Sequence, residues 1–306
     1  MIRIELQIAL TYEIDGGGAD FVFNVHAAHT ASQTITGENL YLSQSVPQRM
    51  YTVPESGNRY MYVHAGPGDL KLSYTATVDL LHHFADPALI HEVPIKDMPP
   101  EVMGYIYPSR YCQSDRLIKL ANNEFGQLPQ GYGRVQAIRD WVNRHIKFTM
   151  NSSNSNTSAV DSIIEQVGVC RDFAHLMIAL CRAINIPARF ATGTDYGADP
   201  MLGPSDFHAY VEVYLGYRWY IFDPSGTGIR QGFVRFGTGR DAADVAFATV
   251  FGGVRTHAAV IRAVAIEDLA NGLQLPRHCA EAISTDSGKT LAPANMEGAT
   301  SQPLLW

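Results

Sequence analysis

Apolar and polar side chains alternate through much of the first hundred residues, the period of strands that bury one face. Alternating runs cover residues 2–8 and 21–25, and the three glycines Gly16–Gly18 between them predict a turn. Further strand-like runs are Glu38–Leu42, Asn58–His64 and Leu70–Val78. Several short strands separated by turn residues predict an all-β, sandwich-like domain over residues 1–95.

The pattern changes after this region. Residues 96–112 are rich in proline, which interrupts regular structure and predicts an inter-domain linker. Helical periodicity follows, first from Ser114 and then over residues 134–146. We therefore place a second domain at 113–266. A C-terminal extension follows at 267–306, and its polar part, 284–306, is predicted to be poorly ordered.

The most apolar helical pattern runs from Cys170 to about Asn185, and Pro187 ends it. Its apolar stripe consists of Phe173, Ala174, Met177, Leu180, Cys181 and Ile184. Gly168 permits a tight turn just before it. The pattern predicts a buried, central helix that begins with a cysteine.

Two features lie upstream of this helix. Ser162 and Glu165 have the capping-box spacing of a short helix. Residues 151–158 are nearly all Asn, Ser and Thr, which predicts an exposed loop. Because the loop precedes Cys170, it either borders a cleft at that residue or is an inert, solvated loop.

A hairpin is predicted from Phe207–Leu215 and Arg218–Asp223, with Gly216 and Tyr217 as its loop. A two-residue loop pairs Leu215 with Arg218. That register places Asp223 on the same face as His208 and diagonal to it. A slip of one residue would separate the two side chains.

Composition narrows the possible functions of the 306 residues. Apolar residues make up 46%, and the net charge is −7 without a basic stripe, so nucleic acid is not an expected partner. No apolar run is long enough to predict a membrane span. The N-terminus lacks a signal-peptide pattern, so a cytoplasmic location is expected, with earlier processing left open.

Four cysteines, Cys112, Cys170, Cys181 and Cys279, form no CxxC pair, and the histidines are scattered. This spacing does not predict a zinc or other metal site, and the cysteines are expected to be free thiols.

A thiol, an imidazole and a carboxylate, in this order, suggest Cys170 as nucleophile, His208 as general base and acid, and Asp223 as the group that orients the imidazole. A helix N-terminus stabilises a thiolate. The backbone N–H of Cys170 is a candidate oxyanion donor, and Gln166 is a candidate for the second. The alternative is a purely structural role, in which Cys170 is buried and inert and His208 is a hydrogen-bonded polar residue.

Three further residues are candidates for the cleft. Asp172 is close to the nucleophile, but stabilisation of the first helical turn is the favoured role for it. Asp195 and Tyr196 lie in a turn-rich loop after a predicted strand, where they could line the cleft.

Four segments resemble the transglutaminase-like superfamily in order and spacing: Gly168–Ala174, Ala183–Arg189, His208–Val213 and Trp219–Pro224. The resemblance covers about residues 130–225. The first hundred residues are similar, more weakly, to the β-rich N-terminal region that accompanies such domains in bacteria.

The resemblance implies an α+β, papain-like core in which the cysteine helix packs on an antiparallel sheet that carries His208 and Asp223. It implies Cys170, His208 and Asp223 as the catalytic triad. No metal or organic cofactor is implied.

The leading hypothesis is a thiol-dependent enzyme that acts on peptide or protein amide bonds through a thioester, most simply a cysteine protease or amidase. Transfer to an amine, as in a transglutaminase, is the alternative. A non-catalytic binding or scaffold protein that retains the fold is the rival from another class. The oligomeric state is left open, and the N-terminal β-domain is a candidate interaction module in either case.

Overall fold

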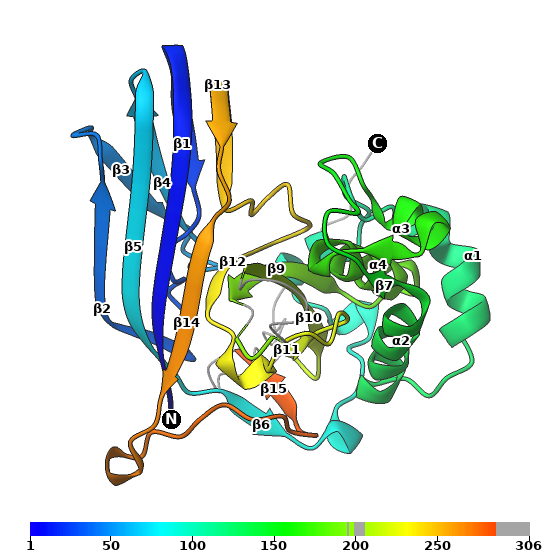
Figure 1. The fold of residues 1–306 in the computed structure, drawn as a ribbon. Coiled ribbons are helices and arrows are strands. Elements are labelled where there is room, and N and C mark those ends of the chain that lie inside the picture. The colour runs from blue at the N-terminus through cyan, green and yellow to red at the C-terminus, as the bar shows by residue number, and fades with distance from the viewer. Residues whose placement is uncertain (195, 199–205, 286–306) are drawn as a thin grey trace, which may run out of the picture.

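The computed structural model describes residues 1–194, 196–198 and 206–285. A β-domain stands beside a mixed domain of helices and a second sheet (Figure 1). The first sheet has seven strands: β1 Ile2–Phe23, β2 Gln33–Leu42, β3 Gln48–Thr52, β4 Arg59–Ala65, β5 Gly68–Leu80, β13 Ala248–Thr256 and β14 Val260–Ile266. Its order is β2-β5-β1-β4-β3, and β13 and β14 both pair with β1. The predicted runs Glu38–Leu42 and Leu70–Val78 lie in β2 and β5, and the run Asn58–His64 begins one residue before β4.

The turn predicted at the glycine triplet Gly16–Gly18 is wrong. β1 continues through it, and the register against β13 shifts between Ile14 and Ala19. The first half of β1 pairs with β5 and the second half with β4. Tyr12 and Phe21, one from each half, contact each other with ring centroids 5.1 Å apart. β1 is therefore one long strand whose two halves pair with different neighbours around a single apolar core, with an irregularity at the glycines.

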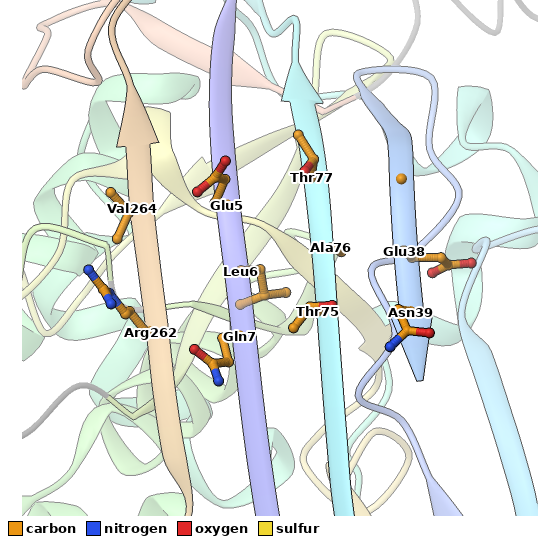
Figure 2. Close-up of a pocket in the computed structure, with 11 residues that line it drawn as sticks. Glu5, Leu6, Gln7, Glu38, Asn39, Thr75, Ala76, Thr77, Arg262 and Val264 are labelled. Atoms are coloured by element: carbon orange, nitrogen blue, oxygen red, sulfur yellow. The ribbon is translucent and has the colours of Figure 1, made fainter. Parts of the chain in front are cut away.

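The outer face of the sheet is polar, as the alternation predicts. Glu5 and Gln7 project from β1 beside Thr75 and Thr77 of β5 over a shallow hollow of about 490 Å³ (Figure 2). Leu6 lies between the two β1 side chains, points to the opposite face and is 3% exposed. Period-two alternation thus separates core from solvent in these strands.

The predicted domain boundaries need correction. The sequence pattern predicts residues 248–266 in the second domain, but β13 and β14 pair with β1 on the side opposite β4 and β5 and so belong to the β-domain sheet. In the other direction, β6 (His83–Ala85) joins the second sheet. The chain therefore crosses between the domains more than once: β6 joins the second sheet, and β13 and β14 return to the first.

The second sheet has the order β12-β9-β10-β11-β15-β6. Its other strands are β9 Ala188–Thr194, β10 Phe207–Leu215, β11 Arg218–Phe222, β12 Arg235–Gly239 and β15 Ala282–Ser284. All its pairings are antiparallel. The predicted poorly ordered tail begins too early, because Ser284 and Thr285 are buried. Its remainder, from residue 286, lies outside the described residues.

Four α-helices cover this sheet: α1 Ser114–Phe125, α2 Tyr132–His145, α3 Ala159–Glu165 and α4 Cys170–Ala183. Helix α4 lies between the sheet and the other helices, and from Asp172 to Ala183 every residue is buried. The predicted central helix is therefore confirmed. The start predicted for α3 is wrong, because the capping box uses Ser158 and Asp161 and the helix begins at Ala159.

Short elements fill the connections. The 3₁₀ turns are Pro87–Leu89, Ile95–Asp97, Pro100–Tyr105, Arg230–Gly232 and Leu269–Asn271, and a two-residue ladder joins β7 Lys147–Phe148 to β8 Val167–Gly168. Within the described residues, no helix is long and apolar enough to cross a membrane.

Candidate active site

Cys170 occupies the first position of α4 and is partly exposed. Its Sγ lies 3.9 Å from the backbone carbonyl oxygen of Phe207, the first residue of β10. The thiol therefore sits at the positive end of the buried helix and directly beside the strand that carries His208.

A buried carboxylate fixes the start of the helix. Asp172 is fully buried, and its Oδ2 accepts a hydrogen bond from the backbone N–H of Val169 at 2.8 Å. This contact supports the predicted role of Asp172 in stabilising the first turn, because that N–H would otherwise lack an intrahelical acceptor.

Gly168 is needed for a different reason from the predicted tight turn. Its φ is not positive. A Cβ at this position would lie 2.8 Å from the Cβ of Asp172 and 3.1 Å from its Oδ2. The glycine thus permits the close approach of the carboxylate to the backbone that precedes Cys170.

The β10–β11 hairpin has the predicted register. Leu215 pairs with Arg218, and Gly216 and Tyr217 form the loop with φ values of 53° and 63°, as in a type I′ turn. His208 and Asp223 are 2% and 5% exposed, and Nε2 of His208 lies 3.4 Å from Oδ1 of Asp223. The two groups make a close charge contact that lacks the alignment of a hydrogen bond.

Asp223 is held by its own loop. Ser225 donates from both its backbone N–H (3.2 Å) and its Oγ (2.7 Å) to Oδ1, and the N–H of Gly228 donates to Oδ2 at 3.2 Å. The carboxylate is therefore oriented independently of the histidine.

The electrostatics of the pair favour a charged imidazolium. Burial by itself lowers the pKa of His208, but the Asp223 carboxylate, and then Cys170, outweigh it and raise the pKa to about 10. Burial likewise raises the pKa of Asp223, but His208 and the hydrogen bonds from Ser225 and Gly228 outweigh it and lower that pKa below its ordinary value. A cationic His208 beside Cys170 is suited to stabilise a thiolate.

Cys170 and His208 open into a cleft of about 750 Å³. Asn151, Ser153 and Ser155 line one part of it, so the Asn/Ser/Thr-rich loop borders the cleft, the first of its two predicted roles. Apolar side chains predominate elsewhere in the lining. Phe207 stacks on Phe247, with ring centroids 4.4 Å apart.

The remaining predicted cleft residues are placed elsewhere. Gln166 is exposed at the C-terminal end of α3, and its carbonyl accepts a hydrogen bond from the Lys147 N–H at 2.9 Å. It does not line the cleft, so its predicted oxyanion role is wrong. Tyr196 packs against the β-domain core instead of lining the cleft. Asp195 lies outside the described residues.

The sequence places His175 close to the nucleophile, and the structure buries it one helical turn beyond the first turn of α4. Its Nε2 accepts a hydrogen bond from the Ala242 N–H at 3.2 Å, and its ring stacks on Tyr111 at 5.0 Å. Burial, with nearby arginines, holds the pKa of His175 well below its ordinary value, so the ring is neutral. Since Ala242 and Tyr111 both line the cleft, His175 supports its wall from beneath.

Sequence reasoning missed the wall made by residues 247–250. Ala248, Thr249 and Val250 belong to β13 and line the same cleft as Cys170. The β-domain sheet therefore contributes directly to the site. Among the described residues, no group of three or more His, Cys, Asp or Glu side chains is arranged to hold a metal ion.

Comparisons with known proteins cover both domains. Residues 119–224 match the family model of the transglutaminase-like superfamily, and residues 2–101 match that of the bacterial transglutaminase N-terminal domain. A crystal structure from Cytophaga hutchinsonii, described as a putative cysteine protease, is 37% identical. The match covers 92% of this chain and 97% of that one, with a TM-score of 0.84.

Curated relatives are uncharacterized mycobacterial proteins. One from Mycobacterium leprae is 25% identical over 146 residues, which cover 46% of this chain and 52% of the relative. One from Mycobacterium tuberculosis is 33% identical over 125 residues, which cover 36% and 40%. The chain thus spans about half or less of the length of these relatives.

Proposed function

The chain belongs to the transglutaminase-like superfamily, and from this premise we propose that it is a thiol-dependent enzyme that cleaves peptide or amide bonds. The observation that carries the proposal is the position of Cys170. It begins a buried helix, opens into the cleft and lies beside a histidine that contacts a buried carboxylate.

In the first step the thiolate of Cys170 attacks the carbonyl carbon of the substrate amide, and the carbonyl π electrons move to the oxygen. The imidazolium of His208 then donates its proton to the departing nitrogen as the C–N bond breaks. An acyl thioester remains on Cys170, and a free amine is released.

In the second step His208 removes a proton from water, whose oxygen attacks the thioester carbonyl. The C–S bond breaks, the product leaves as a carboxylic acid, and the thiolate–imidazolium pair is restored. Asp223 keeps the imidazole oriented in both steps. The backbone N–H of Cys170, in the first helical turn, is the proposed oxyanion donor.

An amine in place of water would make the same thioester the intermediate of a transglutaminase. Hydrolysis and transfer to an amine would use the same triad. The experiment must therefore determine whether water or an amine accepts the acyl group. A non-catalytic scaffold is disfavoured, because Cys170 opens into a large cleft instead of being sealed in the core.

The test compares the wild type with Cys170→Ala. Iodoacetamide at neutral pH is expected to alkylate the wild type rapidly at Cys170. A panel of fluorogenic peptide amides is expected to be cleaved by the wild type alone. Unchanged iodoacetamide labelling in the Cys170→Ala variant would contradict the hypothesis that Cys170 is an activated thiolate. A fluorescent primary amine added to a glutamine-containing protein tests the alternative, because incorporation of the amine would identify a transferase.

A further inference from the structure

One edge of β13 faces the cleft, and no described strand pairs with it. Among the described residues β13 pairs only with β1, and residues 248–250 line the cavity that contains Cys170. An unpaired edge presents a row of backbone donors and acceptors that an added strand can satisfy.

The register identifies which groups this edge presents. The N–H of Asn24 donates to the carbonyl of Phe247 at 2.9 Å, and Phe23 lies opposite Ala248. In an antiparallel ladder, hydrogen-bonded pairs alternate with pairs whose N–H and C=O groups point away from each other. Ala248 and Val250 are therefore the residues whose backbone groups point away from β1.

The same part of the cleft is apolar. Phe207 directly precedes His208 and stacks on Phe247, which directly precedes β13. The carbonyl of Phe207 lies 3.9 Å from Sγ of Cys170. A chain paired with β13 would thus pass an aromatic surface that is continuous with the nucleophile.

We propose that the free edge of β13, at Ala248 and Val250, binds an extended, apolar peptide segment of the substrate by backbone hydrogen bonds. This inference rests on the proposed function and deepens it. It makes the β-domain a part of the substrate-binding site, and it selects unfolded or extended segments as substrates, because a folded helix cannot pair with a strand edge.

Proline substitution isolates the backbone donor. Val250→Pro removes an N–H that points to the cleft, without removing a hydrogen bond to β1. Val254→Pro is the matched control on the same strand. The His257 N–H donates to the Thr11 carbonyl, so by the same alternation the N–H of Val254 also points away from β1, but Val254 does not line the cleft.

The probe is acetyl-Leu-Val-Ala chloromethyl ketone, and the readout is the second-order rate of Cys170 alkylation. Loss of one hydrogen bond is expected to slow the reaction of Val250→Pro about five- to tenfold. Val254→Pro is expected to react at nearly the wild-type rate, because Val254 does not line the cleft. Iodoacetamide, which has no peptide backbone, is expected to react equally with all of them.

A second measurement does not depend on the folding of any variant. Probe analogues with one N-methylated amide each are applied to the wild type, and methylation at a paired amide is expected to slow alkylation by a similar factor. Equal rates for every analogue and for Val250→Pro would overturn the inference while leaving the proposed function intact. Failure of both iodoacetamide and the peptide probe to label Cys170 would instead remove the proposed function and this inference with it.

Discussion

Nε2 of His208 lies 3.4 Å from Oδ1 of Asp223, and both side chains are buried in the second domain. The carboxylate already accepts three hydrogen bonds from Ser225 and Gly228. Its position is thus set by the loop after β11, and the histidine meets a fixed negative charge. This arrangement stabilises a buried imidazolium, which the apolar surroundings would otherwise disfavour.

Replacement of Asp223 by asparagine is expected to lower the pKa of His208 from about 10 to below the ordinary value of a histidine, because burial then dominates. The raised pKa stabilises the folded protein below the unfolded-state pKa, and this contribution is lost as the pH rises through about 10. In the variant, the imidazolium should be lost at a much lower pH. Imidazole ¹⁵N chemical shifts across a pH titration measure this directly.

The activity of Asp223→Asn is expected to fall by about 10²-fold or more, because an uncharged, poorly oriented imidazole is a weaker acid and base. The exposed pair of Asp20 and His64, with Oδ1 and Nδ1 2.8 Å apart, offers a matched control. Asp20→Asn should leave both the kcat/KM and the titration of His208 unchanged. An unaltered His208 titration in Asp223→Asn would contradict the assigned role of Asp223.

Gly168→Ala is expected to lower the free energy of unfolding by about 1–3 kcal/mol, because its Cβ would lie 2.8 Å from that of Asp172 and force the carboxylate to move. Displacement of Asp172 would also loosen the helix start at Cys170. Urea unfolding measures the first effect, and the rate of iodoacetamide alkylation measures the second.

Gly133 in α2 supplies the control. A Cβ there meets no atom within 4 Å, and the residue is exposed. Gly133→Ala should therefore raise the free energy of unfolding by about 0.5–1 kcal/mol through helix propensity alone. If both alanine variants were stabilised alike, the close approach at Gly168 would not be the reason for that glycine.

The local parts of the site could be predicted from the sequence, because their signals lie within a few residues of each other. The apolar stripe after Cys170 indicates a buried helix, and a two-residue loop at Gly216 and Tyr217 fixes the register that brings Asp223 to His208. Period and turn length are short-range properties. They suffice here because the hairpin itself carries two of the three residues.

The cleft walls could not be predicted in the same way. Residues 248–250 line the cleft because β13 pairs with β1, whose sequence lies at the other end of the chain, and no local pattern identifies that partner. Proximity to Cys170 in sequence makes Gln166 a candidate for the cleft, yet it lies exposed at the C-terminal end of α3. Proximity in sequence is thus a poor predictor of which residues line the cleft, because strands distant in sequence form part of its wall.

A buried amide, Asn58, contributes to the contact between the two domains. Nδ2 of Asn58 donates to the carbonyl of Thr238 at 2.8 Å, and the N–H of Thr238 donates back to Oδ1 at 2.9 Å. Asn58→Ala leaves both backbone groups of a buried strand unpaired, so the free energy of unfolding should fall by about 2–4 kcal/mol. Asn39→Ala, on the exposed face of β2 (Figure 2), should change it little. Urea unfolding of both variants tests this, and equal losses would contradict it.

Glu212 binds two arginines inside the second domain. It is fully buried on β10, four residues after His208, and accepts hydrogen bonds from Arg189 on β9, Arg235 on β12 and Thr285. Burial raises the pKa of Glu212, but the two arginines outweigh it and lower that pKa below its ordinary value. The Glu212 carboxylate therefore links β9, β12 and the segment after β15 to β10, the strand that carries His208.

Glu212→Gln keeps the size of this side chain but leaves two buried guanidinium groups without their shared carboxylate. The free energy of unfolding is expected to fall by about 3–5 kcal/mol at neutral pH. Because the folded-state pKa of Glu212 is lowered, its contribution is present above the unfolded-state pKa and is lost as the pH falls through the folded-state value. The variant should therefore lack part of the acid sensitivity of the wild type. Urea unfolding between neutral and acidic pH measures both effects.

Glu13→Gln, at a surface pair with His257, is the control and should lower the free energy of unfolding by less than about 1 kcal/mol. A Glu212→Gln variant as stable as Glu13→Gln would show that the arginines do not need this charge.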